Sequence, residues 1–351
     1  MLLRSILKLK FFSVLFILLL AALTSCGKGG DTPTPVSTAP TNLTLEATVS
    51  GTSGNVVFKA SATNAVMYTF DLGNGIKDQV SVTGDLTYKY STTGVYTVTV
   101  VAKSSSGATA SKTTVLNVTT TLSLVWADEF DATTASAPDP SKWGYDLGAG
   151  GWGNNELEYY TNRTTNSIVS GGTLKITAIK EALSGSNYTS ARLLSKGKFS
   201  FKYGRVEVSA KLPAGGGTWP AIWMLGDNIS TAGWPNCGEI DIMEHTGNSL
   251  NKIYGTLHYP GRFGGNPDGA TTMISNATTA FHKYTLEWTD VNIKIYVDDV
   301  VFYTFANNPT TPFNQNFFLI LNVAMGGNMG GTIDPAFTSS AMEIDYIRVY
   351  Q

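Results

Sequence analysis

The stretch "GEIDIMEH", residues 238–245, alternates like a β-strand and yet carries three carboxylates within six residues. The whole chain has only 14% charged residues, against the roughly 25% that is usual in globular proteins. Because strand side chains alternate between two faces, Glu239 and Asp241 share one face, whereas Glu244 should point to the other. The stretch therefore predicts a β-strand whose clustered acids serve a chemical function. The side to which Glu244 points needs an explanation if the three acids act together.

Strand-like runs surround this stretch from residue 122 to the end, among them "GTLKITAI", "GKFSFKYGRVEVSAKL", "TWPAIWML", "FFLILNVA" and "MEIDYIRVY". They are separated by Gly-rich turns, and no long helical period interrupts them. All seven Trp lie in this part of the chain. We expect one all-β domain over residues 120–351, a large antiparallel sandwich or β-jelly-roll.

A second, smaller β-sandwich is predicted over residues 41–119. Short alternating runs such as "NVVFKASA" and "YTVTVVAKS" are bounded there by Gly, Asn or Ser. The segments "FDLGNG" (70–75) and "TYKYSTTGVYTVTVVA" (87–102) resemble the polycystic kidney disease (PKD) repeat, an immunoglobulin-like spacer common in exported bacterial hydrolases. Asp71 in this segment reads as a turn residue, and no catalytic constellation is evident.

The first 26 residues have the composition of a secretory signal, with basic residues, an apolar run of 13 residues at 11–23 and small residues before Cys26. A lone membrane-spanning helix would need roughly 20 apolar residues. The ending "LTSC" resembles a bacterial lipobox, which implies that Cys26 is lipidated. Residues 27–40 are rich in Gly, Pro and Thr and read as a tether. We expect an exported lipoprotein anchored to a cell-envelope membrane, at the outer membrane or the cell surface.

Cysteine and charge usage limit the partners. The chain has two cysteines, Cys26 and Cys237; a disulfide between them is the alternative to lipidation, and it would tie the tether to the acidic stretch. Without the three basic residues of the signal, 21 of 24 Lys and Arg remain against 26 Asp and Glu, a net charge of −5. This balance and the lack of basic runs argue against nucleic acid as a partner, and we expect a monomer.

Two uses for the carboxylates of residues 238–245 are open on the residues alone. Burying three charges costs several kcal/mol each unless a site uses them. A calcium cage would use carboxylate oxygens as hard ligands. Glycoside hydrolysis would use one carboxylate as nucleophile and another as proton donor, and a third acid between them could keep the pKa of the donor high.

The context favours hydrolysis. Together with "GTWPAIWMLGD" before it, "GWGNNELEYYT" (151–161) and the terminal "EIDYIRVY", the stretch resembles glycoside hydrolase family 16, in particular its laminarinase branch, over about 126–351. The resemblance implies a concanavalin-like jelly roll whose concave sheet binds a polysaccharide, with retention of configuration and no cofactor for the chemistry. It implies that Glu239 is the nucleophile, Asp241 the assisting acid and Glu244 the general acid/base.

The same resemblance accounts for the register. The laminarinase branch carries one residue more here than branches with a shorter EIDIE form, and an inserted residue in a strand is a β-bulge. We expect the bulge at Ile242 and Met243. It would return Glu244 to the face of Glu239 and Asp241.

Sugar contacts are implied for seven further residues. Aromatic rings offer apolar faces to pyranose C–H groups, and the polar positions match family positions that bond sugar hydroxyls; the set is Trp219, Trp223, Trp234, Asn155, Glu156, Arg192 and His258. The remaining large aromatics Trp126, Trp143 and Trp288 are expected in the core, and His245 is expected to be packed. Met329 departs from the pattern, which often has Trp there.

A structural calcium on the convex side is a further implication of the resemblance. The nearest matches to its ligands are Glu129, Gly172 and Asp345. The alternative is that Asp345 is an ordinary carboxylate at the sheet edge.

The expected function is therefore a surface-tethered, retaining endo-β-1,3-glucanase acting on β-1,3-glucan. Alternatives in the same family are a mixed-linkage β-glucanase and a galactan hydrolase of the agarase or carrageenase kind. A non-catalytic carbohydrate-binding or calcium-binding surface protein is the alternative outside enzymes. Replacing Glu239 separates these classes, because only a hydrolase loses turnover while the fold and binding persist.

Overall fold

The computed structural model describes residues 38–351. The predicted signal, Cys26 and most of the predicted tether lie outside these residues. The described chain is dominated by strands; its helical segments are single turns, α1 (Ile229–Ala232), α2 (Gly327–Gly330) and the 3₁₀ turn η1 (Gly151–Gly153). None of the helices in the described chain is long and apolar enough to cross a membrane. The all-β expectation is confirmed.

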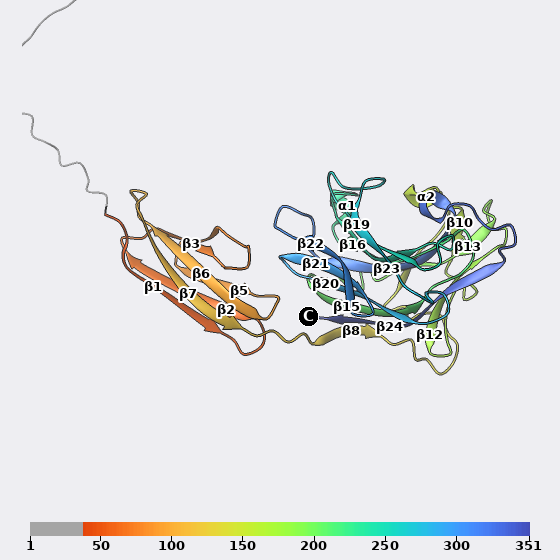
Figure 1. The fold of residues 1–351 in the computed structure, drawn as a ribbon, viewed down its shortest axis with the longest axis horizontal. Helices are drawn as coiled ribbons and strands as arrows, with labels where there is room; N and C mark the ends of the chain where they lie inside the picture. Colours follow the sequence, from red (N-terminus) through yellow and green to blue (C-terminus); the bar gives the residue numbers. More distant parts are fainter. Residues whose placement is uncertain (1–37) are drawn as a thin grey trace, which may run out of the picture. The chain divides into compact units, whose positions relative to one another are not determined.

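The first sandwich consists of a three-stranded and a four-stranded antiparallel sheet, ordered β1-β2-β5 and β4-β3-β6-β7 (Figure 1). Its strands are β1 (Thr41–Val49), β2 (Asn55–Thr63), β3 (Met67–Asp71), β4 (Gln79–Ser81), β5 (Asp85–Lys89), β6 (Gly94–Lys103) and β7 (Thr109–Val118). Along β6, Tyr96, Val98, Val100 and Ala102 are buried and the residues between them are more exposed. This period of two places one face of each sheet in a core of its own.

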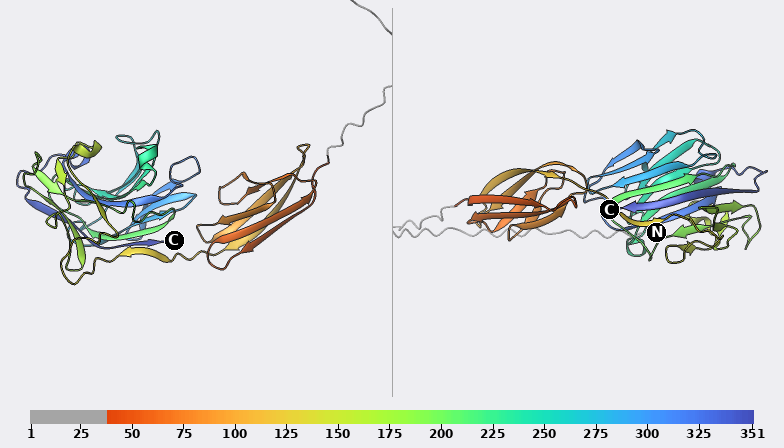
Figure 2. Two further views of the ribbon diagram at one scale, coloured as in Figure 1. Left: turned by 180° about the vertical axis from the view of Figure 1, so that it is seen from behind. Right: turned by 90° about the horizontal axis from the view of Figure 1, so that it is seen from below.

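The second sandwich packs two larger sheets face to face (Figures 1 and 2). One has seven strands in the order β19-β18-β17-β16-β23-β14-β9, and the other follows β10-β13-β12-β24-β15-β20-β21-β22, with β11 beside β12 and β8 beside β24. The strands before residue 212 are β8 (Leu124–Asp128), β9 (Gly144–Asp146), β10 (Glu158–Tyr160), β11 (Ser167–Ser170), β12 (Thr173–Ile179), β13 (Tyr188–Ser190), β14 (Arg192–Leu194) and β15 (Gly204–Lys211). The later strands are β16 (Thr218–Gly226), β17 (Glu239–His245), β18 (Lys252–His258), β19 (Asp268–Met273), β20 (His282–Trp288), β21 (Asn292–Val297), β22 (Val300–Ala306), β23 (Phe317–Met325) and β24 (Ser339–Tyr350).

One continuous apolar core lies between these two sheets. The aromatics expected there are found there: Trp143 and Trp288 are buried, and Trp126 packs against the core, stacked on Phe199 with ring centroids 4.9 Å apart. Strand β23 is buried along all nine residues and lies in the interior of its sheet, between β16 and β14. The expected large sandwich is confirmed. Because the core lies between the sheets, the outer face of each sheet can carry different side chains.

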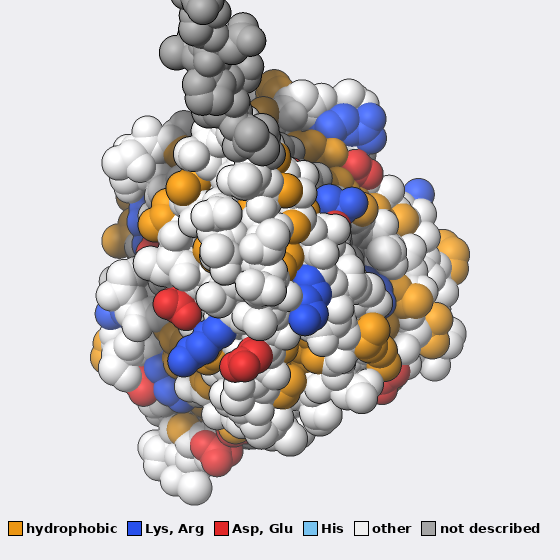
Figure 3. Space-filling view, turned by 90° about the vertical axis from the view of Figure 1, so that its left-hand side faces the viewer, with side chains coloured by type: hydrophobic (Ala, Val, Ile, Leu, Met, Phe, Trp, Pro, Cys, Tyr) orange, Lys and Arg blue, Asp and Glu red, His pale blue; other side chains and the backbone are white. Residues whose placement is uncertain are grey.

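Charged side chains are dispersed on the face of the molecule seen in Figure 3. Lys and Arg lie there singly among uncharged side chains, with Asp and Glu between them. This face carries no field of one sign that would attract a polyanion over a distance.

Candidate active site

The predicted β-bulge is present in β17. Toward β16, Met243 pairs with Ile222 and Asp241 pairs with Trp223, so Ile242 has no partner of its own. Toward β18 the register also shifts between Asp241 and Glu244. Two residues of β17 therefore oppose one residue of each neighbour, and the alternation of side chains slips by one.

The bulge separates the residues of β17 cleanly. Ile240, Ile242 and Met243 are fully buried in the core between the sheets. Glu239 and Glu244 are partly exposed, and the side chain of Asp241 is 3% exposed. The three acids thus occupy the face of the seven-stranded sheet that is turned away from the core, as predicted from the sequence.

Cross-strand register defines this face further, because residues directly opposite each other in a sheet point to the same side. One row runs from Glu244 through Ala221 and Asn322 to Arg192 and Asp146; the next places Asp241 beside Trp223. We call this side of the sheet the acid face. It brings together residues from four separate regions of the sequence.

Indole N–H groups hold the two outer acids. Trp234 Nε1 donates to Glu239 Oε2 at 2.6 Å, and Trp219 Nε1 donates to Glu244 Oε1 at 3.0 Å. Thr256 Oγ1 lies 3.4 Å from the other oxygen of Glu244. Both Trp predicted as sugar contacts beside the acids therefore touch the acids themselves.

His258 faces the middle acid. The backbone N–H of Gly264 donates to His258 Nδ1 at 3.2 Å, so Nδ1 is an acceptor and the ring proton of a neutral imidazole is on Nε2. Nε2 lies 3.3 Å from Asp241 Oδ2. His258 thus contacts Asp241, the middle of the three acids of β17.

Burial and mutual repulsion raise the pKa values of the three acids. For Glu239 and Asp241 the pKa lies well above the usual range, first through desolvation and then through the charge of a neighbouring acid, Asp241 and Glu244 respectively. The pKa of Glu244 is raised by desolvation, against the hydrogen bond from Trp219. Burial and repulsion thus disfavour three simultaneous negative charges, which suits a trio that must supply both an anion and a proton donor.

A second cluster on the acid face surrounds Arg192. Its guanidinium lies over two indole rings, 4.8 Å from the ring centroid of Trp223 and 5.0 Å from that of Trp152. Its Nε is 3.0 Å from Asp146 Oδ2. Asn155 donates to Asn328 Oδ1 at 2.8 Å. Trp152 was missed in the sequence, although it stands in the quoted "GWGNNELEYYT".

Glu156 lies deeper than its expected role suggests. It is 8% exposed, and its two oxygens accept hydrogen bonds from Asn154 Nδ2 at 3.2 Å and Tyr160 Oη at 2.9 Å. His245, which was expected to be packed, is fully buried and its Nε2 is 2.9 Å from the carbonyl oxygen of Leu250.

The residues predicted to bind calcium have other surroundings. Both oxygens of Glu129 accept from Arg348, at 2.9 and 2.7 Å, and this guanidinium lowers the pKa of Glu129. Asp345 is exposed, and Gly172 lies in a turn with φ of 78°. Within residues 38–351, the group of acids and histidines with ligand atoms close enough to share a cation is Glu239, Asp241 and His258, within 4.8 Å of one another. A calcium at Glu129 remains a prediction.

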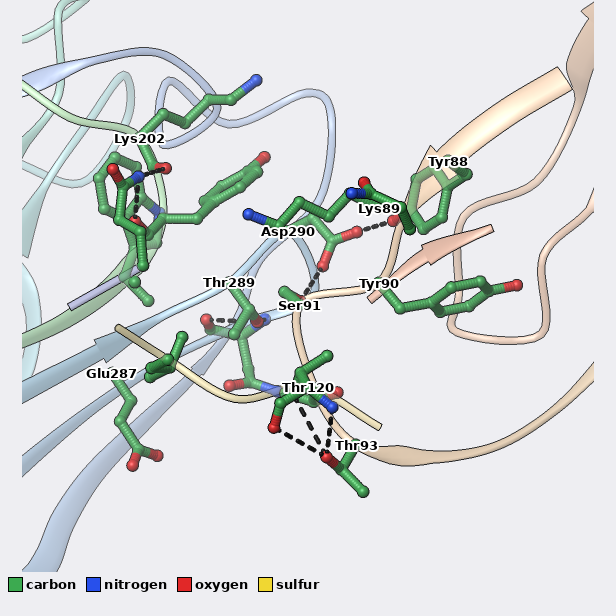
Figure 4. A pocket seen from close by; sticks show the side chains of 18 of the residues that line it. Tyr88, Lys89, Tyr90, Ser91, Thr93, Thr120, Lys202, Glu287, Thr289 and Asp290 are labelled. Atoms are coloured by element: carbon green, nitrogen blue, oxygen red, sulfur yellow. Dashed lines mark hydrogen bonds between the residues drawn. The ribbon is translucent and has the colours of Figure 1, made fainter. Parts of the chain in front are cut away.

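A cavity of about 1020 Å³ lies away from the acids (Figure 4). Its carboxylate Asp290 accepts hydrogen bonds from Tyr88 Oη and, at 2.8 Å, from Ser91 Oγ, and burial raises the pKa of Asp290 to about 6. Glu287, which also lines this cavity, accepts hydrogen bonds from Arg205 at 2.6 Å and Tyr296 at 2.5 Å. Both side-chain carboxylates of the lining are therefore already engaged by protein donors.

Two family models match the chain. The model described as glycosyl hydrolases family 16 matches residues 154–348, which include all three acids of β17. The model described as beta-glucan synthesis-associated protein SKN1/KRE6/Sbg1 matches residues 56–240 and ends before Asp241 and Glu244. The first model therefore covers all three acids, and the second covers only Glu239.

Several similar proteins are glucan-degrading enzymes by name. A beta-glucanase of Rhodothermus marinus is 46% identical over 244 residues, 65% of this chain and 85% of that protein. The X-ray structure of the laminarinase from Rhodothermus marinus superposes with a TM-score of 0.63 at 46% identity, over 66% of this chain and 98% of the other. A structure of LamA from Zobellia galactanivorans in complex with laminaritriose and laminaritetraose has a TM-score of 0.60 at 45% identity, over 65% of this chain and 98% of the other.

Proposed function

Because the chain belongs to glycosyl hydrolases family 16, we propose that it is an endo-β-1,3-glucanase that cleaves internal bonds of a laminarin-type β-glucan with retention of configuration. The observation that carries the proposal is the bulge, which puts Glu239 and Glu244 on one face with Asp241 between them. The named relatives and the laminarin-oligosaccharide complex of the Zobellia enzyme support a β-1,3-linked substrate.

The chemistry follows from the two outer acids. Glu239 attacks the anomeric carbon while the bond between that carbon and the glycosidic oxygen breaks. At the same time Glu244 gives its proton to the glycosidic oxygen, so the leaving sugar departs as a neutral alcohol. Glu244, now ionised, takes a proton from water, whose oxygen attacks the anomeric carbon and releases Glu239. Two inversions at one carbon leave the configuration unchanged.

The hydrogen-bond donors around the acids help to give the acids different roles. The N–H of Trp234 lowers the pKa of Glu239 against the effect of burial and so favours the carboxylate that must attack. Asp241 raises the pKa of Glu239 and is itself faced by the Nε2–H of His258. None of these steps uses a metal or an organic cofactor.

Two measurements test the proposal. Reducing-sugar release is expected from laminarin, and activity on agarose or carrageenan alone would overturn the glucanase assignment in favour of a galactan hydrolase; lichenan reports the mixed-linkage alternative. Glu239→Gln should abolish turnover while leaving the melting temperature and laminari-oligosaccharide binding in place. Turnover near the wild-type rate in that variant would overturn the catalytic assignment of Glu239, whereas binding of laminari-oligosaccharides with no hydrolysis by the wild-type protein would leave a carbohydrate-binding protein as the better description.

We further propose that the protein is an exported lipoprotein held to an envelope membrane through Cys26, with the PKD-like sandwich as a spacer. The lipobox-like "LTSC" and the Gly-, Pro- and Thr-rich segment after it support this. Cys26→Ala should move the protein from the membrane fraction to the soluble fraction; a wild-type protein found wholly in the medium would contradict the anchor. A calcium site at Glu129, Gly172 and Asp345 would require Glu129 to leave Arg348, and a melting temperature raised by added calcium would reveal it.

A further inference from the structure

Glu158 is a fully buried carboxyl group that the hydrolytic mechanism does not use. It begins the short strand β10 and is 0% exposed. Its Oε2 accepts a hydrogen bond from the backbone N–H of Met325 at 2.6 Å, and its Oε1 receives no donor from residues 38–351. Its neighbour is Glu156, which interacts with it both by charge and by a side-chain hydrogen bond. Two adjoining buried carboxyl groups raise the question of which one holds a proton.

The direction of a hydrogen-bond chain answers this question. Trp223 Nε1 can only donate, and it donates to Asn322 Oδ1 at 2.7 Å. Asn322 must therefore turn its Nδ2 to Tyr160, to whose hydroxyl oxygen it donates at 3.0 Å. The hydroxyl hydrogen of Tyr160 is then directed to Glu156 Oε2, 2.9 Å away, while Asn154 donates to Glu156 Oε1.

Glu156 is thus the terminal acceptor, with a donor on each oxygen. Two negative charges side by side would be costly here, since Glu156 and Glu158 are 8% and 0% exposed. Burial, followed by the charge of Glu156, raises the pKa of Glu158 well above its usual range. The proton of the pair therefore resides on Glu158, which has a free oxygen to carry it.

The chain starts on the acid face. Trp223 pairs in register with Asp241, and the guanidinium of Arg192 lies over its ring. The same guanidinium lies over the ring of Trp152, whose centroid is 5.5 Å from that of Tyr160. Trp223 and Arg192, which would bind a sugar beside the acids, are therefore held in place by the hydrogen-bond chain that ends at Glu156 and Glu158.

We propose that Glu158 is a positioning residue that stays protonated in the working enzyme and donates a hydrogen bond to Glu156, so that the chain from Trp223 ends on a fixed acceptor. The proposal rests on the proposed glucanase function, because it assigns the region of Trp223 and Arg192 to substrate binding. The titratable groups that face Glu158 are Glu156 and Tyr160, and the pKa of Tyr160 is itself raised by burial. Arg192, paired with Asp146, supplies the positive charge of this region.

The test compares Glu158→Gln with unchanged Glu158, each in the inactive Glu239→Gln background, by calorimetric titration of laminaritetraose from mildly acidic to alkaline pH. Glutamine has the shape of a protonated glutamate and its N–H donor, but it cannot ionise. With Glu158 present, affinity should fall by about tenfold as pH rises through its raised pKa, the equivalent of one hydrogen bond exchanged for repulsion. With glutamine there, affinity should match at acidic pH and lack this loss.

Effects of Asp241 and Glu244 on the titration are common to both proteins, so their difference isolates Glu158. Identical pH dependence in the two proteins, or weak binding by the glutamine variant at every pH, would overturn the positioning role. So would failure of that variant to fold, because a neutral isostere should fit this site at least as well. If neither protein bound laminaritetraose at any pH, the glucanase proposal itself would fail instead.

Discussion

At the scale of single residues, the acid face works because its neighbours act on the acids in opposite directions. Burial raises the pKa of Glu239 and Asp241 adds to the rise, whereas the indole N–H of Trp234 lowers it. Since Glu239 must be ionised to attack, the acidic limb of the activity profile should report these influences. Two substitutions can therefore move one limb in opposite directions.

Asp241→Asn is expected to shift the acidic limb of kcat/KM to lower pH, because the negative charge that raises the pKa of Glu239 is gone. Catalysis should fall by about a hundredfold, the usual range for loss of a group that assists proton transfer. A pH–rate profile on laminarin measures both effects. Asp131→Asn, at an exposed position, is the control, and an unchanged or upward-shifted limb in Asp241→Asn would contradict the assignment.

Trp234→Phe should move the same limb upward. Phenylalanine keeps an aromatic ring but removes the N–H that donates to Glu239 at 2.6 Å, so the carboxylate is less stabilised and kcat at acidic pH should fall by about tenfold. Trp126→Phe is the matched control, because that indole packs on Phe199 at a distance from the acids. A profile that does not move would show that the hydrogen bond is unimportant in the free enzyme.

Individual residues also show which parts of the site could be predicted from the sequence and which could not. The three acids and the tryptophans beside them could be predicted because their motif is compact in the chain. Trp152, Tyr160 and Asn322 were missed, since each matters only through partners remote in sequence; the bond from Trp223 to Asn322 spans 99 residues. The lone clue to Glu158 is a glutamate amid hydrophobic and aromatic neighbours, which does not reveal that it lies against Glu156.

At the scale of elements, the bulge in β17 decides which way Glu244 points. Its position could be predicted because the resemblance to the laminarinase branch implies one inserted residue at the point where the spacing of the acids breaks the period of two. The neighbours of β17 could not, since strand order depends on contacts across the whole sheet. Strand β23, more than 70 residues later in the chain, lies beside β16 and supplies Asn322 to the acid face.

Deleting Ile242 should regularise β17 and turn either Glu244 or the apolar residues before it to the wrong face. The expected result is complete loss of activity and a loss of several kcal/mol in the free energy of unfolding, because a carboxyl group would enter the core or apolar side chains would leave it. Denaturant unfolding and laminarin hydrolysis measure these effects. Ile242→Val, which shortens the same buried side chain, should cost only about 1 kcal/mol and keep the activity.

At the scale of the whole molecule, the two sandwiches have separate apolar cores with no shared member among the described residues. Removal of residues 38–119 should therefore leave kcat on soluble laminari-oligosaccharides within about twofold, since a domain with its own core can fold alone. Steady-state kinetics and circular dichroism of residues 120–351 would check this. A large loss of kcat with the remaining sandwich folded would contradict a spacer role.

Whole-molecule features divide in the same way between what sequence pattern predicts and what it does not. The existence of two β-sandwiches and the boundary near residue 120 follow from alternation and Gly-rich turns. The pairing of sheet edges does not, and neither does the pairing of Glu129 with Arg348, which lie 219 residues apart. Contacts across such separations leave no local period for a sequence pattern to show.

The place of β23 and β24 in the second sandwich has a consequence for biosynthesis. β23 separates β16 from β14 in one sheet, and β24 separates β12 from β15 in the other, yet both strands come from residues 317–350. Until these residues leave the ribosome, each half-built sheet has a gap at its middle and exposes strand edges open to wrong pairing. We therefore expect this sandwich to fold only once residues 317–350 are available, and a chain that ends before Phe317 should require a chaperone to remain free of aggregates.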